Sequence, residues 1–310
     1  MLFILPLIVA IAGIYHFYSG NHLTEGTALP GIIPSEILAY LRPEGKMFFI
    51  YLFTLGIAYL LFFVNIRYKF LAQTTTLPAV IYIILTIGLL VKGIFSWVLF
   101  PAFIIVWAFT GLLGAINNTK SNRFIFNFGF WIALAVLFYP KVVLLILWAF
   151  CVLFFSGRST LKDIMALTIG ILTPVYFILF YYYWTDQLNQ FFILFKENLW
   201  AGEYLHQLTT LQIVRYSALL LLLFVSLYYI TLYYPVSTVS QRRSMVSLLS
   251  MLVFCILTFL FIPGIRFDFM YLVAFPLSYI YSQYFVIQRL PIFGNILFLL
   301  LLGAGFVFEI

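Results

Sequence analysis

Charged side chains are scarce in this sequence, and acidic ones are the scarcest. Only 8% of the 310 residues are charged, 65% are hydrophobic, and the chain holds nine Asp and Glu in total. Soluble domains contain about 25% charged and about 45–50% apolar residues. The composition therefore excludes an ordinary soluble domain and indicates a membrane protein.

Cysteine is almost absent as well. Cys151 and Cys255 both fall inside apolar runs, where they are typical small core residues rather than a disulfide or a metal pair. The sequence also lacks a phosphate-binding glycine loop, zinc-ligand spacing and a nucleophile elbow. We therefore expect no cofactor and no metal site.

Apolar runs recur along the whole chain, which is typical of an all-α polytopic bundle of transmembrane helices. We predict ten or eleven spans, close to residues 2–18, 48–66, 77–91, 98–116, 124–139, 142–156, 164–184, 214–234, 244–262, 269–286 and 292–308. The runs 124–139 and 142–156 are short, and they could instead form a re-entrant hairpin that turns at Pro140 and Lys141. Either alternative leaves the downstream topology unchanged, within one membrane domain covering residues 1–310.

Basic residues between the runs predict the orientation in the membrane. Nine of the sixteen fall in alternate connectors: Arg67, Lys69, Lys120, Arg123, Arg158, Lys162, Arg242, Arg243 and Arg289. Basic loops remain cytoplasmic, so we expect a bacterial inner-membrane protein with its N-terminus inside and its C-terminus outside. Only Asp163 among the acids falls on the cytoplasmic side. The net charge of +7 thus reflects topology and not nucleic-acid binding.

Two segments on the predicted outer side, residues 19–47 and 185–213, are long enough to have structure of their own. In the first, Pro34 and Ser35 open a short helix that stops before Pro43. In the second, the apolar residues follow helical spacing: Leu188, Phe191, Phe192, Phe195 and Leu199. Trp200 follows this stripe. We expect short helices that lie in the membrane interface.

The outer charges are the candidate functional residues. Lys141, Arg215 and Arg266 sit at outer helix ends, and guanidinium and ammonium groups there suit a phosphate-bearing lipid. Asp268 and Glu25 lie on the same side, and a partly buried carboxylate can act as a general base. The alternative is that the cations only extend toward the headgroups and that Arg266 pairs with Asp268.

The stretch from residue 67 to residue 190 resembles a multi-pass inner-membrane family of Bacteroidota for which no activity is established. The similarity rests on five features: Leu77-Pro78 after a basic connector, a Phe-Asn-x-Gly element at Phe126, the "LFYPK" break, the Arg158 connector, and Gly170 to Pro174 before an aromatic run. The resemblance implies a multi-pass membrane fold. It brings no catalytic residues.

Three functions remain open on the sequence. The first is a glycosyltransferase- or polymerase-like enzyme that acts on a polyprenyl-phosphate-linked glycan or lipid at the outer face. The second is a non-enzymatic subunit or scaffold that binds a partner in an envelope or secretion complex. The third is a lipid transporter, although mid-span polar residues such as Thr86, Thr110, Ser226 and Thr258 are few. Membrane lipids are the expected partners in each case.

Overall fold

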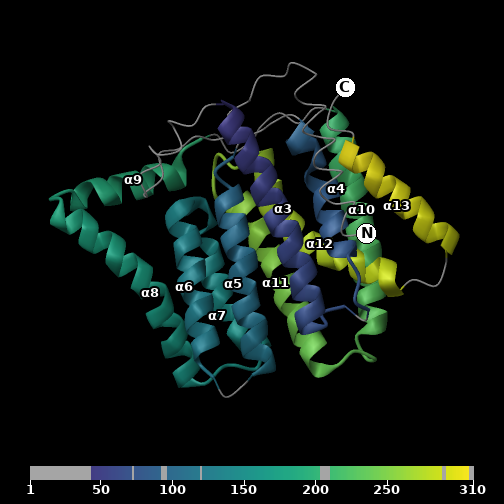
Figure 1. The fold of residues 1–310 in the computed structure, drawn as a ribbon, viewed down its shortest axis with the longest axis horizontal. Coiled ribbons are helices and arrows are strands. Elements are labelled where there is room, and N and C mark those ends of the chain that lie inside the picture. Colours follow the sequence, from purple (N-terminus) through teal and green to yellow (C-terminus); the bar gives the residue numbers. More distant parts are fainter. Residues whose placement is uncertain are drawn as a thin grey trace.

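The computed structural model describes residues 43–71, 73–91, 96–118, 121–202, 210–287 and 291–306, and these are helical with short connectors and no strand (Figure 1). The α-helices are α3 (Pro43–Tyr68), α4 (Leu77–Val91), α5 (Leu99–Asn117), α6 (Arg123–Phe138), α7 (Leu144–Phe155), α8 (Leu161–Trp184), α9 (Leu188–Trp200), α10 (Thr210–Tyr233), α11 (Val239–Phe261), α12 (Met270–Ile287) and α13 (Pro291–Phe306). Two 3-10 turns, η1 (Pro140–Val142) and η2 (Phe267–Phe269), precede α7 and α12. The predicted all-α bundle is confirmed.

Ten of the eleven predicted runs coincide with helices, and the run 2–18 lies outside the described residues. Six helical segments are long and apolar enough to cross a membrane: Gly45–Tyr68, Leu99–Asn117, Leu161–Trp184, Gln212–Tyr233, Val239–Phe261 and Phe267–Ile287. Helices α4, α6, α7 and α13 are shorter. Helix α7 has 12 residues and extends about 18 Å, short of the roughly 30 Å of a hydrocarbon core. The hairpin at 124–156 therefore stays a prediction.

Connectors that alternate along the chain meet at opposite ends of the bundle. At one end, which we call the basic end, Arg158 donates to the Ser121 carbonyl at 3.0 Å and Gln241 donates to the Lys69 carbonyl at 3.1 Å. At the other, the η1–η2 end, Lys141 bonds to carbonyls that precede α10 and α12. Connectors assigned to one side by their charge thus contact one another.

A buried ion pair stabilises the basic end. Arg158 and Asp163, both almost fully buried, lie 3.2 Å apart. Asp163 also closes a capping box with Thr160, which fixes the start of α8. Because Arg158 also contacts the connector between α5 and α6, this one side chain ties two connectors together.

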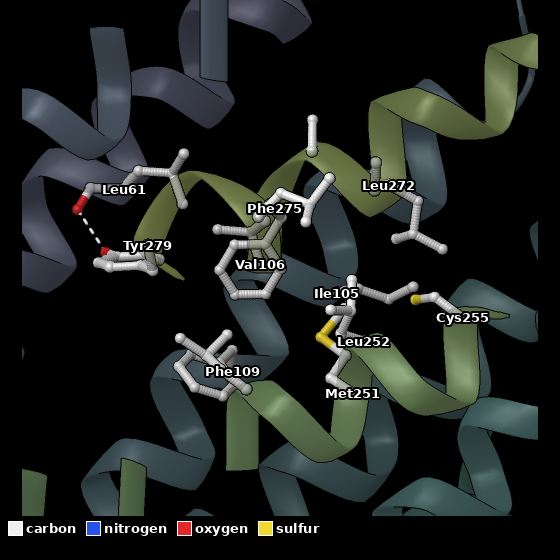
Figure 2. Packing of buried hydrophobic residues seen from close by; sticks show 14 of the residues in the cluster. Leu61, Ile105, Val106, Phe109, Met251, Leu252, Cys255, Leu272, Phe275 and Tyr279 are labelled. Atoms are coloured by element: carbon white, nitrogen blue, oxygen red, sulfur yellow. Dashed lines mark hydrogen bonds between the residues drawn. The ribbon is translucent and has the colours of Figure 1, made fainter. Parts of the chain in front are cut away.

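Helix α12 runs through the centre of the fold and packs against α4, α5, α10 and α11. Figure 2 shows its Phe275 beside Phe109 of α5, with the ring centroids 5.3 Å apart and edge to face. The hydroxyl of Tyr279 donates to the Leu61 carbonyl at 2.7 Å, so α12 is also tied to α3. Cys255 fills part of this core as a free thiol, as expected.

Two glycines allow α6 and α8 to cross closely. A Cβ on Gly129 would lie 2.7 Å from the Leu167 carbonyl oxygen, and one on Gly170 would lie 2.4 Å from that of Phe126. Small residues at a helix crossing let the two backbones approach closely. Beyond this crossing, Figure 1 shows α8 leaning away from α6 toward the η1–η2 end.

Helix α9 forms where the second outer segment was expected to be helical. It lies across the η1–η2 end, roughly crosswise to α5–α7 (Figure 1). Phe191 of its apolar stripe is buried against Tyr182 and Leu137, whereas Phe192 and Trp200 are exposed. The short helix expected within residues 19–47 lies outside the described residues.

Candidate functional site

Lys141 is the centre of a charged cluster at the η1–η2 end. Its ammonium donates to the Gly264 carbonyl at 2.8 Å and to the Ala201 carbonyl at 3.0 Å, and the side chain is 1% exposed. One cation therefore joins the turn before α7, the end of α9 and the turn between α11 and α12. Pro140, at the first position of η1, sets the backbone angle that begins this turn.

Two glycines make room for the Lys141 ammonium. Gly264 has φ +68°, and a Cβ there would lie 2.7 Å from the Lys141 nitrogen and 2.9 Å from the Cα of Gly202. Gly202 has φ +106° and meets the Gly264 backbone in return. Both positions combine a left-handed conformation with close backbone contact, which only glycine accepts without strain.

Asp268 lies beside this cluster in η2, with a side chain that is 2% exposed. One of its carboxylate oxygens accepts a short hydrogen bond from the Ser96 hydroxyl, which itself accepts from the Val98 amide at 3.1 Å. The connector before α5 is thereby attached to the start of α12. Asp268 and Lys141 are close enough for their charges to interact.

The electrostatic environment of Lys141 is mixed. Burial lowers the pKa of its ammonium to about 8, the carboxylate of Asp268 acts to raise it, and the neighbouring guanidinium of Arg266 lowers it. Desolvation therefore outweighs the carboxylate. Arg266 is exposed, so the surface at this point presents a guanidinium above a buried ammonium and carboxylate.

Arg215 of α10 points into the bundle rather than toward the surface. Its guanidinium donates to the Leu85 carbonyl of α4 at 3.1 Å, and the side chain is 3% exposed. The next residue, Tyr216, stacks on Phe267 of η2 with the centroids 6.1 Å apart and the planes at 17°. Arg215 thus adjoins the Asp268 turn through an aromatic pair and ties α10 to α4.

A group of buried tyrosines extends the cluster into the bundle. The Tyr82 hydroxyl donates to the Tyr271 carbonyl at 3.1 Å, and the phenol of Tyr271 lies within electrostatic range of Tyr51, Tyr82 and Asp268. The hydroxyls of Tyr51 and Tyr271 have no hydrogen-bond partner among the described residues. These tyrosine hydroxyls therefore form a polar region that extends from Asp268 toward the middle of the fold.

The structure brings together three of the five predicted site residues: Lys141, Arg266 and Asp268. Arg215 is adjacent but turned inward, and Glu25 lies outside the described residues. Sequence reasoning missed Ser96 and the tyrosines. Ser96 is the one residue with a hydroxyl between Gly93 and Phe100. A single polar residue directly before an apolar run could have been recognised from the sequence as a candidate site residue.

Comparison of the chain with protein-family models, with curated proteins and with solved structures finds no match. The resemblance to the Bacteroidota membrane family accordingly stays a prediction. Its residues nevertheless have structural roles here: Phe126 and Gly170 meet at the α6–α8 crossing, and Arg158 holds the basic end. The six long apolar helices identify the chain as a multi-pass membrane protein.

Proposed function

We propose that this membrane protein binds a phosphate-bearing lipid at the η1–η2 end and transfers a glycan from it, in the manner of a glycosyltransferase or polymerase. The observation that carries the proposal is the convergence of Arg266, Lys141 and Asp268 from turns more than a hundred residues apart in the chain. The exposed guanidinium of Arg266 is the group suited to bind a phosphate.

Asp268 has the position of a general base in this proposal. Its carboxylate accepts a hydrogen bond from the Ser96 hydroxyl, which is the kind of contact that an acceptor hydroxyl would have to make in its place. During transfer the acceptor oxygen bonds to the anomeric carbon, and the bond from that carbon to the phosphate oxygen breaks. The acceptor proton passes to Asp268, and the lipid phosphate leaves with its charge near Arg266.

We further propose that the protein resides in a bacterial inner membrane with the η1–η2 end outside, its N-terminus inside and its C-terminus outside. Support comes from the charges. In the described chain, the basic end holds seven cations and a single acid: Arg67, Lys69, Arg123, Arg158, Lys162, Arg242, Arg243 and Asp163. A basic end of this kind faces the cytoplasm in membrane proteins.

Binding is tested with purified protein in detergent, titrated with a polyprenyl phosphate and followed by thermal unfolding or native mass spectrometry. Arg266→Ala should weaken binding roughly tenfold or more, because a charge-assisted contact is lost. Lys196→Ala is the matched control, since Lys196 is an exposed cation of α9 at the same end, and it should bind like the wild type. Equal affinity of Arg266→Ala and wild type would refute the lipid site.

The transfer step has its own test. Asp268→Asn should keep the lipid affinity while cells that depend on the protein lose the corresponding surface glycan. Unchanged surface glycans and envelope integrity in that variant would exclude Asp268 as the base.

A lipid transporter is the second candidate, and the span Phe267–Ile287, which consists of η2 and α12, favours it. This span has the lowest mean hydropathy of the six, 1.2, and 78% of it is buried. Polar residues in a buried span often mark a translocation path, and this one carries Asp268, Tyr271 and Ser278. Reconstituted protein that moves a fluorescent polyprenyl phosphate between leaflets without glycan transfer would favour this alternative.

A further inference from the structure

A pocket lies at the basic end, at the opposite end of the bundle from the site above. Its interior is small, about 10 Å³, which is room for one water-sized group, and it is open on one side. The end of α10, the first turn of α11 and the last part of α12 form its walls. Its lining residues are Phe70, Ile230, Tyr233, Tyr234, Ser237, Gln241, Arg242, Met245 and Gln283.

Gln283 is the unusual member of this lining. Its side chain is 2% exposed, and its Oε1 atom has no hydrogen-bond partner in the described chain. Buried polar groups are nearly always hydrogen-bonded, because an unpartnered amide is destabilising. Because the unpartnered amide oxygen lies on the wall of a pocket, we infer that a ligand or an ordered water donates the missing hydrogen bond to it.

The same pocket carries positive charge. Arg242 donates from its Nε atom to the Ser237 carbonyl at 3.0 Å, and its guanidinium lies 5.5 Å from the centre of the Tyr234 ring. These contacts hold the guanidinium in place and leave its Nη groups without a hydrogen bond among the described residues. The pocket also adjoins the first turn of α11, whose start is fixed by the Thr238–Gln241 capping box and carries the positive pole of the helix.

No acid of the described chain offsets this charge. Asp163 is the acidic residue described at the basic end, and Arg158 pairs with it. Tyr234 and Val236 beside the pocket are exposed, at 43% and 78%. A ligand here therefore meets a cation and an amide at one end and an apolar surface at the other.

We propose that a lipid headgroup binds at the mouth of this pocket, with its phosphate beside Arg242 and a hydrogen-bond donor, such as a glycerol hydroxyl or an ethanolamine ammonium, inside the pocket. Arg242 binds the phosphate oxygens, and the donor of the headgroup satisfies Oε1 of Gln283. The acyl chains lie along the exposed surface of α10. Inorganic phosphate could also bind Arg242, but it has no acyl chains to cover the apolar surface. The site is independent of the η1–η2 end.

The test measures the thermal unfolding midpoint of the purified full chain with four additives: short-chain phosphatidylglycerol, phosphatidylethanolamine, phosphatidylcholine and inorganic phosphate. The first two should raise the midpoint most, because the choline headgroup lacks a hydrogen-bond donor. An equal effect of inorganic phosphate would assign the site to free phosphate. Four additives with no effect would overturn the proposal.

Variants separate binding from folding. Gln283→Leu should be at least as stable as the wild type without ligand, because a buried unpartnered amide is removed, yet it should lose the ligand-induced shift. Arg242→Gln should weaken binding roughly tenfold or more. Arg123→Gln, which removes an exposed cation of the same end outside the pocket, should keep the shift. If Gln283→Leu keeps the wild-type shift, the amide holds only water and the proposal is wrong.

Discussion

Lys141 joins three separate connectors at one end of the bundle. A lysine ammonium has three N–H groups, and two of them bind backbone carbonyls that no other described donor satisfies. The side chain therefore organises the surface on which Arg266 lies. Its direct contact with a lipid phosphate, expected from the sequence, stays a prediction.

Lys141→Met should destabilise the protein by about 2 kcal/mol, because the Ala201 and Gly264 carbonyls lose a charged donor and the Gly264 carbonyl stays buried. Thermal or denaturant unfolding in detergent measures the change. Lys196→Met, at an exposed position on α9, should change stability by no more than about 0.5 kcal/mol. A Lys141→Met protein as stable as the wild type would show that the two hydrogen bonds of Lys141 contribute nothing to stability.

The sequence placed Lys141, Arg266 and Asp268 on one side, but it could not show that they meet. The Gly264 carbonyl that binds Lys141 is 123 residues away in the chain, and such a contact depends on tertiary packing. The buried tyrosines were missed for a related reason. Tyrosine in a membrane protein is typical of the headgroup level, whereas Tyr82 and Tyr279 bond to backbone carbonyls deep in the core.

At the scale of helices, prediction was most successful where apolar runs are long, because bilayer insertion and helix formation both require such runs. Boundaries were less accurate. Helix α11 begins at Val239 and not near residue 244, because the Thr238–Gln241 capping box starts the helix within a polar stretch. Counting apolar residues alone overlooks a helix start of this kind.

The α6–α8 crossing makes the sharpest prediction at this scale. Gly170→Ala should destabilise the protein by about 1–3 kcal/mol, because the new Cβ would meet the backbone carbonyl of Phe126, which cannot rotate away. Gly303→Ala on α13 is the control, since its Cβ would meet nothing within 4 Å. That change should be neutral or slightly stabilising, as alanine favours helix. Equal midpoints for the two variants would contradict the close crossing.

For the whole molecule, the two ends differ in charge and in architecture. The basic end combines a buried ion pair, a capping box and seven described cations. The η1–η2 end has the crosswise helix α9 and two 3-10 turns around a few buried charges (Figure 1). This asymmetry is the structural counterpart of the charge alternation in the sequence.

Reporter fusions test the proposed orientation. A periplasm-active reporter placed after Ile310 should be active, and one placed in the connector between α10 and α11 should be inactive. Cytoplasmic activity of a reporter after Ile310 would overturn the eleven-span arrangement.

The most direct test of the proposed lipid site is photocrosslinking of a polyprenyl phosphate that carries a photoreactive group near its phosphate. After irradiation and digestion, mass spectrometry identifies the modified peptides. We expect crosslinks to residues 262–271, around Arg266, that Arg266→Ala strongly reduces. Crosslinks confined to the basic end, or unchanged in Arg266→Ala, would contradict the proposed lipid site.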